Sequence, residues 1–223
     1  LGMNKNKILC KKWPIHRLNF DDERNLITFF EENKIDKVVN TIGFTSVEMC
    51  ESNRESAYFL NVKIPGLLAK ASKTYGCRFI HISTDHLYGT INSCFSEEDP
   101  VVLINEYAKS KYLGERSVLE NNPESLICRT SFFGNGWSVK KSFSEWITES
   151  VKNHREITLF DDVYFNPVNA VRLIDLANKL SDNYNNGIFN ISSDNIITKY
   201  EFGVKLCTSL GINSAYIKRG QLV

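Results

Sequence analysis

Long apolar runs and an excess of charge of either sign are both missing from this sequence. No stretch approaches the roughly 20 apolar residues of a membrane-spanning helix, and the polar first residues do not resemble a signal peptide. The 27 lysines and arginines nearly balance the 26 aspartates and glutamates, which leaves a net charge of +1. Such a balance provides no electrostatic footprint for nucleic acid or an anionic membrane. We therefore predict no nucleic-acid partner and no membrane partner.

Metal-ligand spacing and paired cysteines are missing too. The four histidines show no pattern such as His-Glu-x-x-His, so we predict no bound metal. The six cysteines include no Cys-x-x-Cys pair, and Cys77 and Cys128 lie in apolar, strand-like runs. These features favour reduced, mostly buried thiols in a cytoplasmic protein.

The most informative stretch that is present covers residues 79–111. Residues 79–82 are apolar apart from His81, and the run ends abruptly at Ser83, Thr84 and Asp85. This pattern predicts a buried strand that delivers polar groups at its carboxyl end. Open α/β sheets bind their ligands at that edge.

Tyr107 and Lys111 follow at helical spacing i, i+4, which places both side chains on one face of a predicted helix. A neighbouring ammonium favours the phenolate and is expected to lower the pKa of Tyr107, which would make it a usable general acid. Thr84, or Ser83 beside it, would donate a hydrogen bond to the same oxygen. The group predicts proton delivery to a carbonyl oxygen.

Each half of this pattern also has an ordinary explanation. A Tyr-x-x-x-Lys pair arises by chance in a chain with nine tyrosines, and an amphipathic helix with an exposed lysine accounts for it. A Ser-Thr-Asp strand end can equally be a helix cap or a turn. Their joint occurrence, in this order, favours catalysis.

Three segments together resemble the extended short-chain dehydrogenase/reductase superfamily. They are residues 81–89 (His-Ile-Ser-Thr-Asp-His-Leu-Tyr-Gly), residues 95–100 (Phe-Ser-Glu-Glu-Asp-Pro) and residues 107–115 (Tyr-Ala-Lys-Ser-Lys-Tyr-Leu-Gly-Glu). Within the superfamily the closest resemblance is to the dTDP-4-dehydrorhamnose reductase group, and it extends over most of the chain. It implies an α/β fold, a Rossmann-like doubly wound parallel sheet with a smaller α/β carboxyl-terminal substrate lobe.

The glycine-rich loop that normally opens such a fold is not found in these 223 residues. Residues 1–20 are basic and irregular, and Pro14 blocks a helix through their middle. We expect that the chain lacks its natural start, that a segment is missing, or that ordinary cofactor binding has been abandoned. The resemblance then divides the chain into an incomplete NAD(P)-binding domain, residues 1–134, and a substrate lobe interleaved with it, residues 135–223.

Periodicity and turn residues predict the remaining elements. Helices are expected at 19–33, 46–76 (ended by Gly76), 107–121, 143–151, 169–180 and 198–210. Strands are expected at 36–40, 77–82, 125–129, 157–160 and 187–191. A basic turn is expected near the carboxyl end, just before residue 221. Alternation of strand and helix in the first half indicates a parallel sheet.

The resemblance also assigns roles to individual positions. It implies three catalytic residues, namely Thr84, Tyr107 and Lys111. Positions at the cofactor are Ile42, Gly43, Phe44, Asn61, Ser83, Tyr107, Lys111 and Thr130. Positions at the substrate are Thr45, Asp85, His86, Phe132 and Asn166.

The implied activity is NAD(P)H-dependent reduction of the keto group of a deoxysugar nucleotide, with NAD or NADP as cofactor. One alternative is a sugar-nucleotide epimerase or dehydratase, although a dehydratase carries a glutamate where this chain has His86. Another is a non-catalytic regulatory member of the same fold. A nucleotide sugar is the expected partner, and a homodimer is the default oligomer.

Overall fold

The computed structural model of the chain describes residues 2–3, 14–89, 94–136, 141–183 and 186–222. Their contacts form two compact units. The first, here called the sheet unit, contains Leu18–Thr130 and Ile174–Ile191. The second unit contains the described parts of Leu1–Arg17, Ser131–Leu173 and Ser192–Val223. The chain therefore leaves the sheet unit after Thr130 and returns to it for 18 residues.

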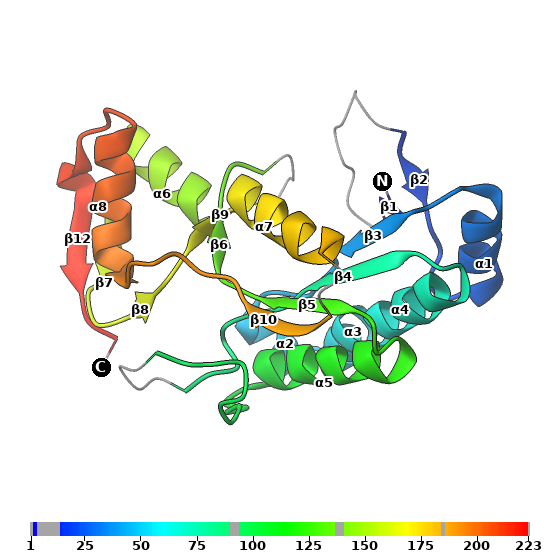
Figure 1. The fold of residues 1–223 in the computed structure, drawn as a ribbon. Coiled ribbons are helices and arrows are strands. Elements are labelled where there is room, and N and C mark those ends of the chain that lie inside the picture. Colours follow the sequence, from blue (N-terminus) through cyan, green and yellow to red (C-terminus); the bar gives the residue numbers. More distant parts are fainter. Residues whose placement is uncertain (1, 4–13, 90–93, 137–140, 184–185, 223) are drawn as a thin grey trace. The chain divides into compact units, whose positions relative to one another are not determined.

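A four-stranded parallel sheet forms the centre of the sheet unit (Figure 1). Its strands, in spatial order, are β10 (Gly187–Asn190), β5 (Leu126–Arg129), β4 (Arg78–Ile82) and β3 (Lys37–Asn40). The register pairs Ile80 of β4 with Val39 on one side and Leu126 on the other. Parallel strands are covered on both faces and therefore read as apolar runs. Their carboxyl ends meet at one edge, which is where the predicted site residues follow β3, β4 and β5.

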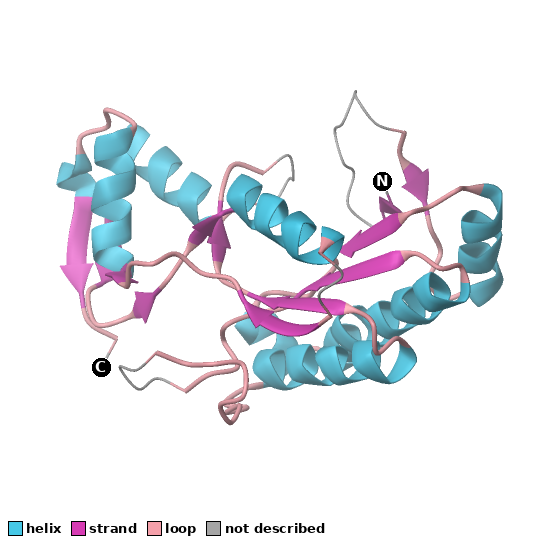
Figure 2. Cartoon of the chain, in the orientation of Figure 1, coloured by secondary structure: helices cyan, strands magenta, loops and turns pink. Residues whose placement is uncertain are grey.

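Helices of the sheet unit surround these strands (Figures 1 and 2). They are α1 (Glu23–Glu32), α2 (Val47–Ser52), α3 (Arg54–Tyr58), the π-helical turn η1 (Phe59–Lys63), α4 (Ile64–Thr74), α5 (Glu106–Asn121) and the second part of α7 (Ala170–Asp182). Helices α4 and α5 pack together, and α4 contacts β3 and β4. Their apolar cluster contains Ile64, Leu68 and Phe79 with Leu26 and Phe30 of α1.

The predicted helix over residues 46–76 is helical in most of its length but is not a single helix. Asn53 ends α2 and begins α3, because its side-chain oxygen accepts a hydrogen bond from the Ser56 amide at 3.0 Å. A π-helical turn then separates α3 from α4. Gly76 ends the segment as predicted, with a positive φ of 68° that few other residues adopt.

The second unit contains short paired strands and an apolar core of its own. Its strands are β1 (Gly2–Met3) with β2 (His16–Arg17), β6 (Phe132–Phe133) with β9 (Val168–Asn169), β7 (Ile157–Phe160) with β12 (Ile217–Gly220), and β8 (Tyr164–Phe165) with β11 (Ile197–Thr198). Its helices are α6 (Phe143–Lys152), the start of α7, α8 (Lys199–Ser209) and the 3-10 turn η2 (Ser214–Tyr216). Ser142 and Thr198 begin α6 and α8 with capping boxes.

One element of this unit was predicted wrongly. Residues 217–220 form a strand, β12, rather than a basic turn. Ile217 is buried in the core with Phe202, and the backbone pairs in parallel with β7. The basic character of Lys218 and Arg219 hid this strand, since both side chains are exposed.

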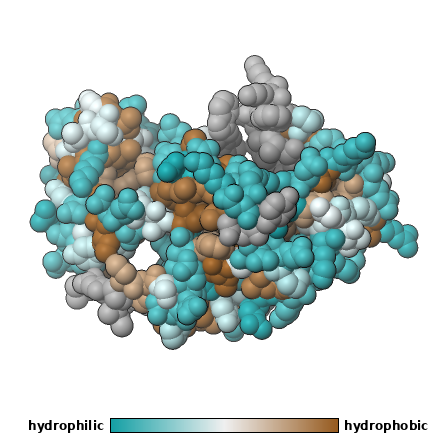
Figure 3. Space-filling view, in the orientation of Figure 1, coloured by the Kyte–Doolittle hydropathy of each residue, from teal (hydrophilic) through white to brown (hydrophobic). Residues whose placement is uncertain are grey.

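None of the described helices combines the length and the apolar character needed to cross a bilayer. Figure 3 shows one face of the molecule, on which hydrophilic residues are widespread and apolar residues gather in patches.

Candidate active site

Three predicted residues, Ser83, Thr84 and Asp85, follow directly after β4 at the carboxyl edge of the sheet. Backbone hydrogen bonds continue beyond the strand, because the Ser83 amide donates to the Cys128 carbonyl at 2.7 Å and the Asp85 amide to the Thr130 carbonyl at 3.4 Å. Ser83, Thr84 and Thr130 are buried. The hydroxyl groups after β4 are thus held in place by the end of β5.

Helix α5 carries Tyr107 and Lys111 to this edge. Asn105 caps the helix, since its Oδ1 accepts from the Ala108 amide at 2.8 Å. The Tyr107 hydroxyl is hydrogen-bonded to Thr84. Lys111 is 4% exposed, and its Nζ donates to the Ile82 carbonyl at 2.9 Å. The structure therefore brings the three predicted catalytic side chains to one place, while their roles stay predictions.

The pKa of Tyr107 differs from the expectation, and burial shifts the pKa of Lys111 as well. Burial raises the pKa of the Tyr107 phenol, and the hydrogen bond with Thr84 only partly opposes this effect. The sequence led us to expect a lowered pKa for Tyr107, whereas this pKa is raised, with burial as the largest cause. Burial also lowers the pKa of Lys111 to about 8, with the Glu115 carboxylate acting against the decrease. At neutral pH, Tyr107 keeps its proton and Lys111 is mostly charged.

The turn after β3 contains the next predicted group. Asn61 of η1 is fully buried and holds Phe44 by both backbone groups: its Oδ1 accepts from the Phe44 amide at 2.7 Å, and its Nδ2 donates to the Phe44 carbonyl at 3.1 Å. Gly43 is exposed and Ile42 is half-buried. Asn61 is thus a buried structural partner of the turn, and Gly43 offers open backbone to a ligand.

His86 and Asp85 lie beside the catalytic group. The His86 amide donates to Thr84 Oγ1 at 3.1 Å, and its ring centroid is 5.7 Å from that of Tyr107. Asp85 is half-buried, and Thr45 is exposed at the end of the turn after β3. These positions are compatible with substrate contacts, which remain predicted.

Two predicted substrate residues belong to the second unit. Phe132 lies in β6 with 54% of its surface exposed. The Nδ2 atom of Asn166 donates to the Ser193 carbonyl at 3.3 Å. The assignment of both residues to the substrate rests on the sequence alone.

Sequence reasoning missed a buried polar network behind the site. Ser83 Oγ donates to Glu115 Oε1 at 2.5 Å, and Arg129 Nη2 donates to Glu115 Oε2 at 2.8 Å. Arg129 Nη1 also donates to the Tyr88 hydroxyl at 2.9 Å, and that hydroxyl donates to Asn190 Oδ1 at 2.8 Å. The sequence did indicate that Glu115 lies next to Lys111, because it follows Lys111 by four residues on the same face of the predicted helix. The network joins β4, β5, β10 and α5.

His81 is a second buried polar group, and it lies in the strand that the sequence predicted to be buried. It is fully buried in β4, and its Nδ1 lies 3.0 Å from Asn40 Nδ2. Burial, and then the charge of Lys111, hold its pKa well below the ordinary value. His81 is therefore neutral in the folded protein.

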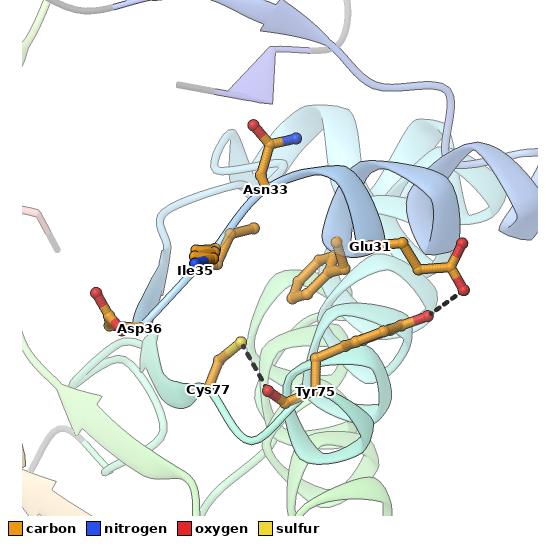
Figure 4. Close-up of a pocket in the computed structure, with 8 residues that line it drawn as sticks. Glu31, Asn33, Ile35, Asp36, Tyr75 and Cys77 are labelled. Carbon is orange, nitrogen blue, oxygen red and sulfur yellow. Dashed lines mark hydrogen bonds between the residues drawn. The ribbon is translucent and has the colours of Figure 1, made fainter.

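A pocket of about 560 Å³ lies away from these residues, next to the amino ends of β3 and β4 (Figure 4). Asp36 and Cys77 line it, and Figure 4 shows the Tyr75 hydroxyl directed toward Glu31, to which it donates at 3.1 Å. None of the predicted site residues lines this pocket. Across the described parts of the chain, no group of three or more His, Cys, Asp or Glu side chains is placed to hold a metal ion.

Comparison with known proteins places these observations in a family. A sequence profile described as the RmlD substrate binding domain matches residues 4–220. The chain is 31% identical over 209 residues to the probable low-salt glycan biosynthesis reductase Agl14 of Haloferax volcanii, covering 92% of this chain and 70% of that protein.

Solved structures agree. A dTDP-4-dehydrorhamnose reductase of Clostridium acetobutylicum aligns with a TM-score of 0.83 at 27% identity over 96% of this chain and 77% of that one. The dTDP-4-dehydrorhamnose reductase of Bacillus anthracis, solved in complex with NADP, aligns with a TM-score of 0.84 at 23% identity over 95% of this chain and 76% of that one. The predicted α/β fold class and the predicted class of enzyme, an NAD(P)-dependent short-chain dehydrogenase/reductase, are confirmed. The chain therefore belongs to the RmlD substrate binding domain family, within the dTDP-4-dehydrorhamnose reductase group of the extended short-chain dehydrogenases/reductases.

Proposed function

We propose that this protein reduces the keto group of a nucleotide-activated deoxysugar, with Tyr107 as the proton donor. The observation that carries the proposal is the meeting of Thr84, Tyr107 and Lys111 at the carboxyl edge of β4, with a phenol that burial keeps protonated. A bound nicotinamide cofactor supplies the hydride. Reduction needs a proton at the developing alkoxide, and a protonated Tyr107 provides it.

Thr84 is suited to orient the carbonyl oxygen. Its Oγ1 accepts a hydrogen bond from the His86 amide, which fixes the hydroxyl while leaving its own hydrogen to donate. The hydrogen bond between Thr84 and Tyr107 holds the two hydroxyls next to each other, so that both can turn to one oxygen of a bound substrate. A pair of fixed donors at one oxygen stabilises the charge that builds there during reduction.

Lys111 and the turn after β3 fit a cofactor of the NAD(P) type. The Lys111 ammonium is buried beside the catalytic group, where a ribose hydroxyl can accept its free hydrogens. Gly43 is exposed and presents no side chain to an approaching ligand. We assign Ile42, Gly43, Phe44, Asn61, Ser83 and Thr130 to the cofactor side as proposals, with Asn61 acting through its hydrogen bonds to Phe44.

The substrate side of the proposal includes Thr45, Asp85, His86, Phe132 and Asn166. We further propose that the sheet unit binds the cofactor and that the second unit contributes to the sugar nucleotide, as NAD(P)-binding domain and substrate lobe. The free cysteines support a cytoplasmic location, because the described ones form no disulfide and Cys94 is exposed. A homodimer remains the default assembly.

Matched variants of α5 test the proposal in the full-length protein. Cofactor binding is measured by fluorescence titration with NADH and NADPH, and turnover with a 4-keto-deoxysugar nucleotide. Tyr107→Phe should lower kcat by about a hundredfold or more with cofactor affinity retained, because only the donated proton is lost. Lys111→Met should weaken cofactor binding.

Two neighbouring substitutions on the same helix serve as controls. Tyr112→Phe removes a hydroxyl, and Lys109→Met removes an exposed ammonium; both should leave turnover and affinity near wild type. A folded full-length protein that binds neither NADH nor NADPH would contradict the proposal and favour the alternative of a non-catalytic, regulatory member of the fold. Full turnover by Tyr107→Phe would assign proton donation to another group.

A further inference from the structure

The side chains of His86 and Asn105 form a hydrogen bond whose donor and acceptor can be assigned from the partners of Asn105. Asn105 Oδ1 faces the Ala108 amide at 2.8 Å, and Asn105 Nδ2 faces His86 Nε2 at 3.0 Å. A backbone N–H only donates, so the Asn105 atom that faces it must be the oxygen. The amide nitrogen therefore faces the histidine. Turning the amide around would place two donors together and remove the cap of α5.

The orientation of Asn105 determines the tautomer of His86. An amide nitrogen only donates, so Nε2 of His86 must accept and cannot carry a proton. The proton of the neutral ring then lies on Nδ1. Within the part of the chain that the structure describes, Nδ1 makes no hydrogen bond, and the ring is half-buried. This N–H is left to donate to a ligand.

The position of this donor connects it with the proposed reaction. The His86 amide is fixed to Thr84, and the His86 ring lies against the ring of Tyr107. Asn105 begins the helix that carries Tyr107 two residues later. One side chain therefore sets both the start of α5 and the hydrogen-bonding pattern of His86.

We propose that Asn105 is a positioning residue that fixes His86 as a neutral Nδ1–H donor, and that this donor recognises an uncharged oxygen of the sugar. A carbonyl or hydroxyl oxygen matches a neutral N–H, whereas a diphosphate would be matched better by a cation. The recognition part of this inference rests on the proposed function. The tautomer part rests on the hydrogen bonds alone.

The chain contains its own reference for the measurement. Asn40 Oδ1 accepts from the Ile42 amide at 3.0 Å, so its Nδ2 faces His81 Nδ1 and leaves the His81 proton on Nε2. His81 and His86 thus carry their protons on opposite ring nitrogens. Two-bond proton–nitrogen NMR correlation spectra of the ¹⁵N-labelled full-length protein separate the two tautomers. His86→Gln assigns the His86 signals by their loss.

Asn105→Asp separates capping from tautomer selection. Aspartate also caps a helix, so α5 keeps its start, but a carboxylate oxygen now faces Nε2 and requires a proton there. We expect the His86 pattern to change to a protonated Nε2 while the His81 pattern stays unchanged. The KM for the keto-sugar nucleotide should rise by about tenfold, the loss of one hydrogen bond, with cofactor affinity retained. Asn105→Ser, which caps without reaching His86, controls for the cap.

Each outcome has one meaning. A wild-type His86 with its proton on Nε2, or with both nitrogens protonated at neutral pH, overturns the assignment to Asn105. An unchanged KM in Asn105→Asp, with the tautomer shifted, overturns the recognition of the sugar. A wild-type protein that shows the expected tautomers but no reduction of the keto sugar contradicts the proposed function and not the assignment to Asn105.

Discussion

Lys111 carries its charge at a site that water hardly reaches, and this gives the proposed reaction a pH dependence. Burial lowers the pKa of Lys111 to about 8, whereas burial raises that of Tyr107. As pH rises through about 8, Lys111 becomes neutral and loses its attraction for ligand oxygens, while Tyr107 keeps its proton. We therefore expect the affinity for NADPH to fall across this range. Fluorescence titrations with NADPH, repeated at intervals of about one pH unit between pH 6 and pH 10, measure this affinity.

Substitutions show whether this alkaline decrease belongs to Lys111. Lys111→Arg keeps a positive charge at every pH and should remove the decrease, even if the affinity itself is lower. Lys109→Met, at an exposed lysine of the same helix, should retain it. If the affinity of Lys111→Arg for NADPH still decreased with the same midpoint pH, the decrease would belong to another group.

The ion pair between Glu115 and Arg129 makes a second prediction at the scale of residues. Both side chains are buried, with exposed fractions of 1% and 3%. Arg129→Met leaves a buried carboxylate with Ser83 as its partner and should lower the free energy of unfolding by about 3–5 kcal/mol. The double variant Arg129→Met, Glu115→Leu removes both charges and should be more stable than the single one. Urea denaturation measures all three proteins.

An exposed ion pair on α5, the helix that carries Glu115, is the control. Arg116→Met removes a pair with Glu120 at 3.8 Å, and its effect should stay below about 1 kcal/mol because water screens both charges. If the double variant were no more stable than Arg129→Met, the unpaired carboxylate of Glu115 would not be the cause of the loss.

At the scale of elements, the placement of α5 depends on one glycine. A Cβ atom at Gly114 would lie 2.0 Å from the Asn61 carbonyl oxygen in η1, which is backbone that cannot rotate away. Gly114→Ala should therefore push α5 from η1, lower stability by about 1–3 kcal/mol and lower kcat by moving Tyr107. Thermal unfolding and turnover measure the two effects.

Gly66 provides the matched comparison. A Cβ at Gly66 would lie 2.2 Å from Ser117 Oγ, which is the end of a side chain that can change rotamer. Gly66→Ala changes the same kind of buried helix contact and should cost less stability and leave kcat close to wild type. Equal loss of kcat in both variants would show that Tyr107 is not positioned through the contact between Gly114 and Asn61.

The sequence was informative about elements wherever the signal was local. Residues 79–82 form an apolar run before polar side chains, and Tyr107 and Lys111 have helical spacing, so β4, α5 and the meeting of their side chains were predictable. The break at Asn53 was not, because Asn53 ends one helix and begins the next within a continuous helical pattern. The partner of Glu115 could not be predicted either, since only the fold brings Arg129 within 2.8 Å.

At the scale of the whole molecule, the assembly of the sheet unit lay beyond local reasoning. Residues 187–191 were predicted as a strand, but periodicity does not say which strand is its partner. In the structure β10 pairs with β5, in register Ile188 with Ile127, although about 60 residues of chain separate them. The segment Ile174–Ile191 therefore belongs to the sheet unit, while the residues on either side of it belong to the second unit.

This division predicts which segments lose protection together when one core is weakened. Phe202 belongs to the apolar cluster of the second unit and Leu68 to that of the sheet unit, and the two clusters share no residue. Truncation of either side chain to alanine should cost about 2–5 kcal/mol. Phe202→Ala should speed amide hydrogen exchange in residues 157–160 and 217–220, and Leu68→Ala in residues 78–82 and 126–129.

Residues 187–190 provide the decisive readout, because they are followed in sequence by the second unit but paired with the sheet. If the sheet unit is built as the contacts indicate, exchange in β10 rises with Leu68→Ala and stays at the wild-type rate with Phe202→Ala. Mass spectrometry of peptic peptides under native conditions resolves these segments. Exchange in β10 that followed Phe202→Ala instead would mean that 174–191 unfolds with its sequence neighbours, and the sheet unit would then end at Thr130. Since Asn190 also accepts from the Tyr88 hydroxyl, the same result would detach the buried network behind Ser83 from β10.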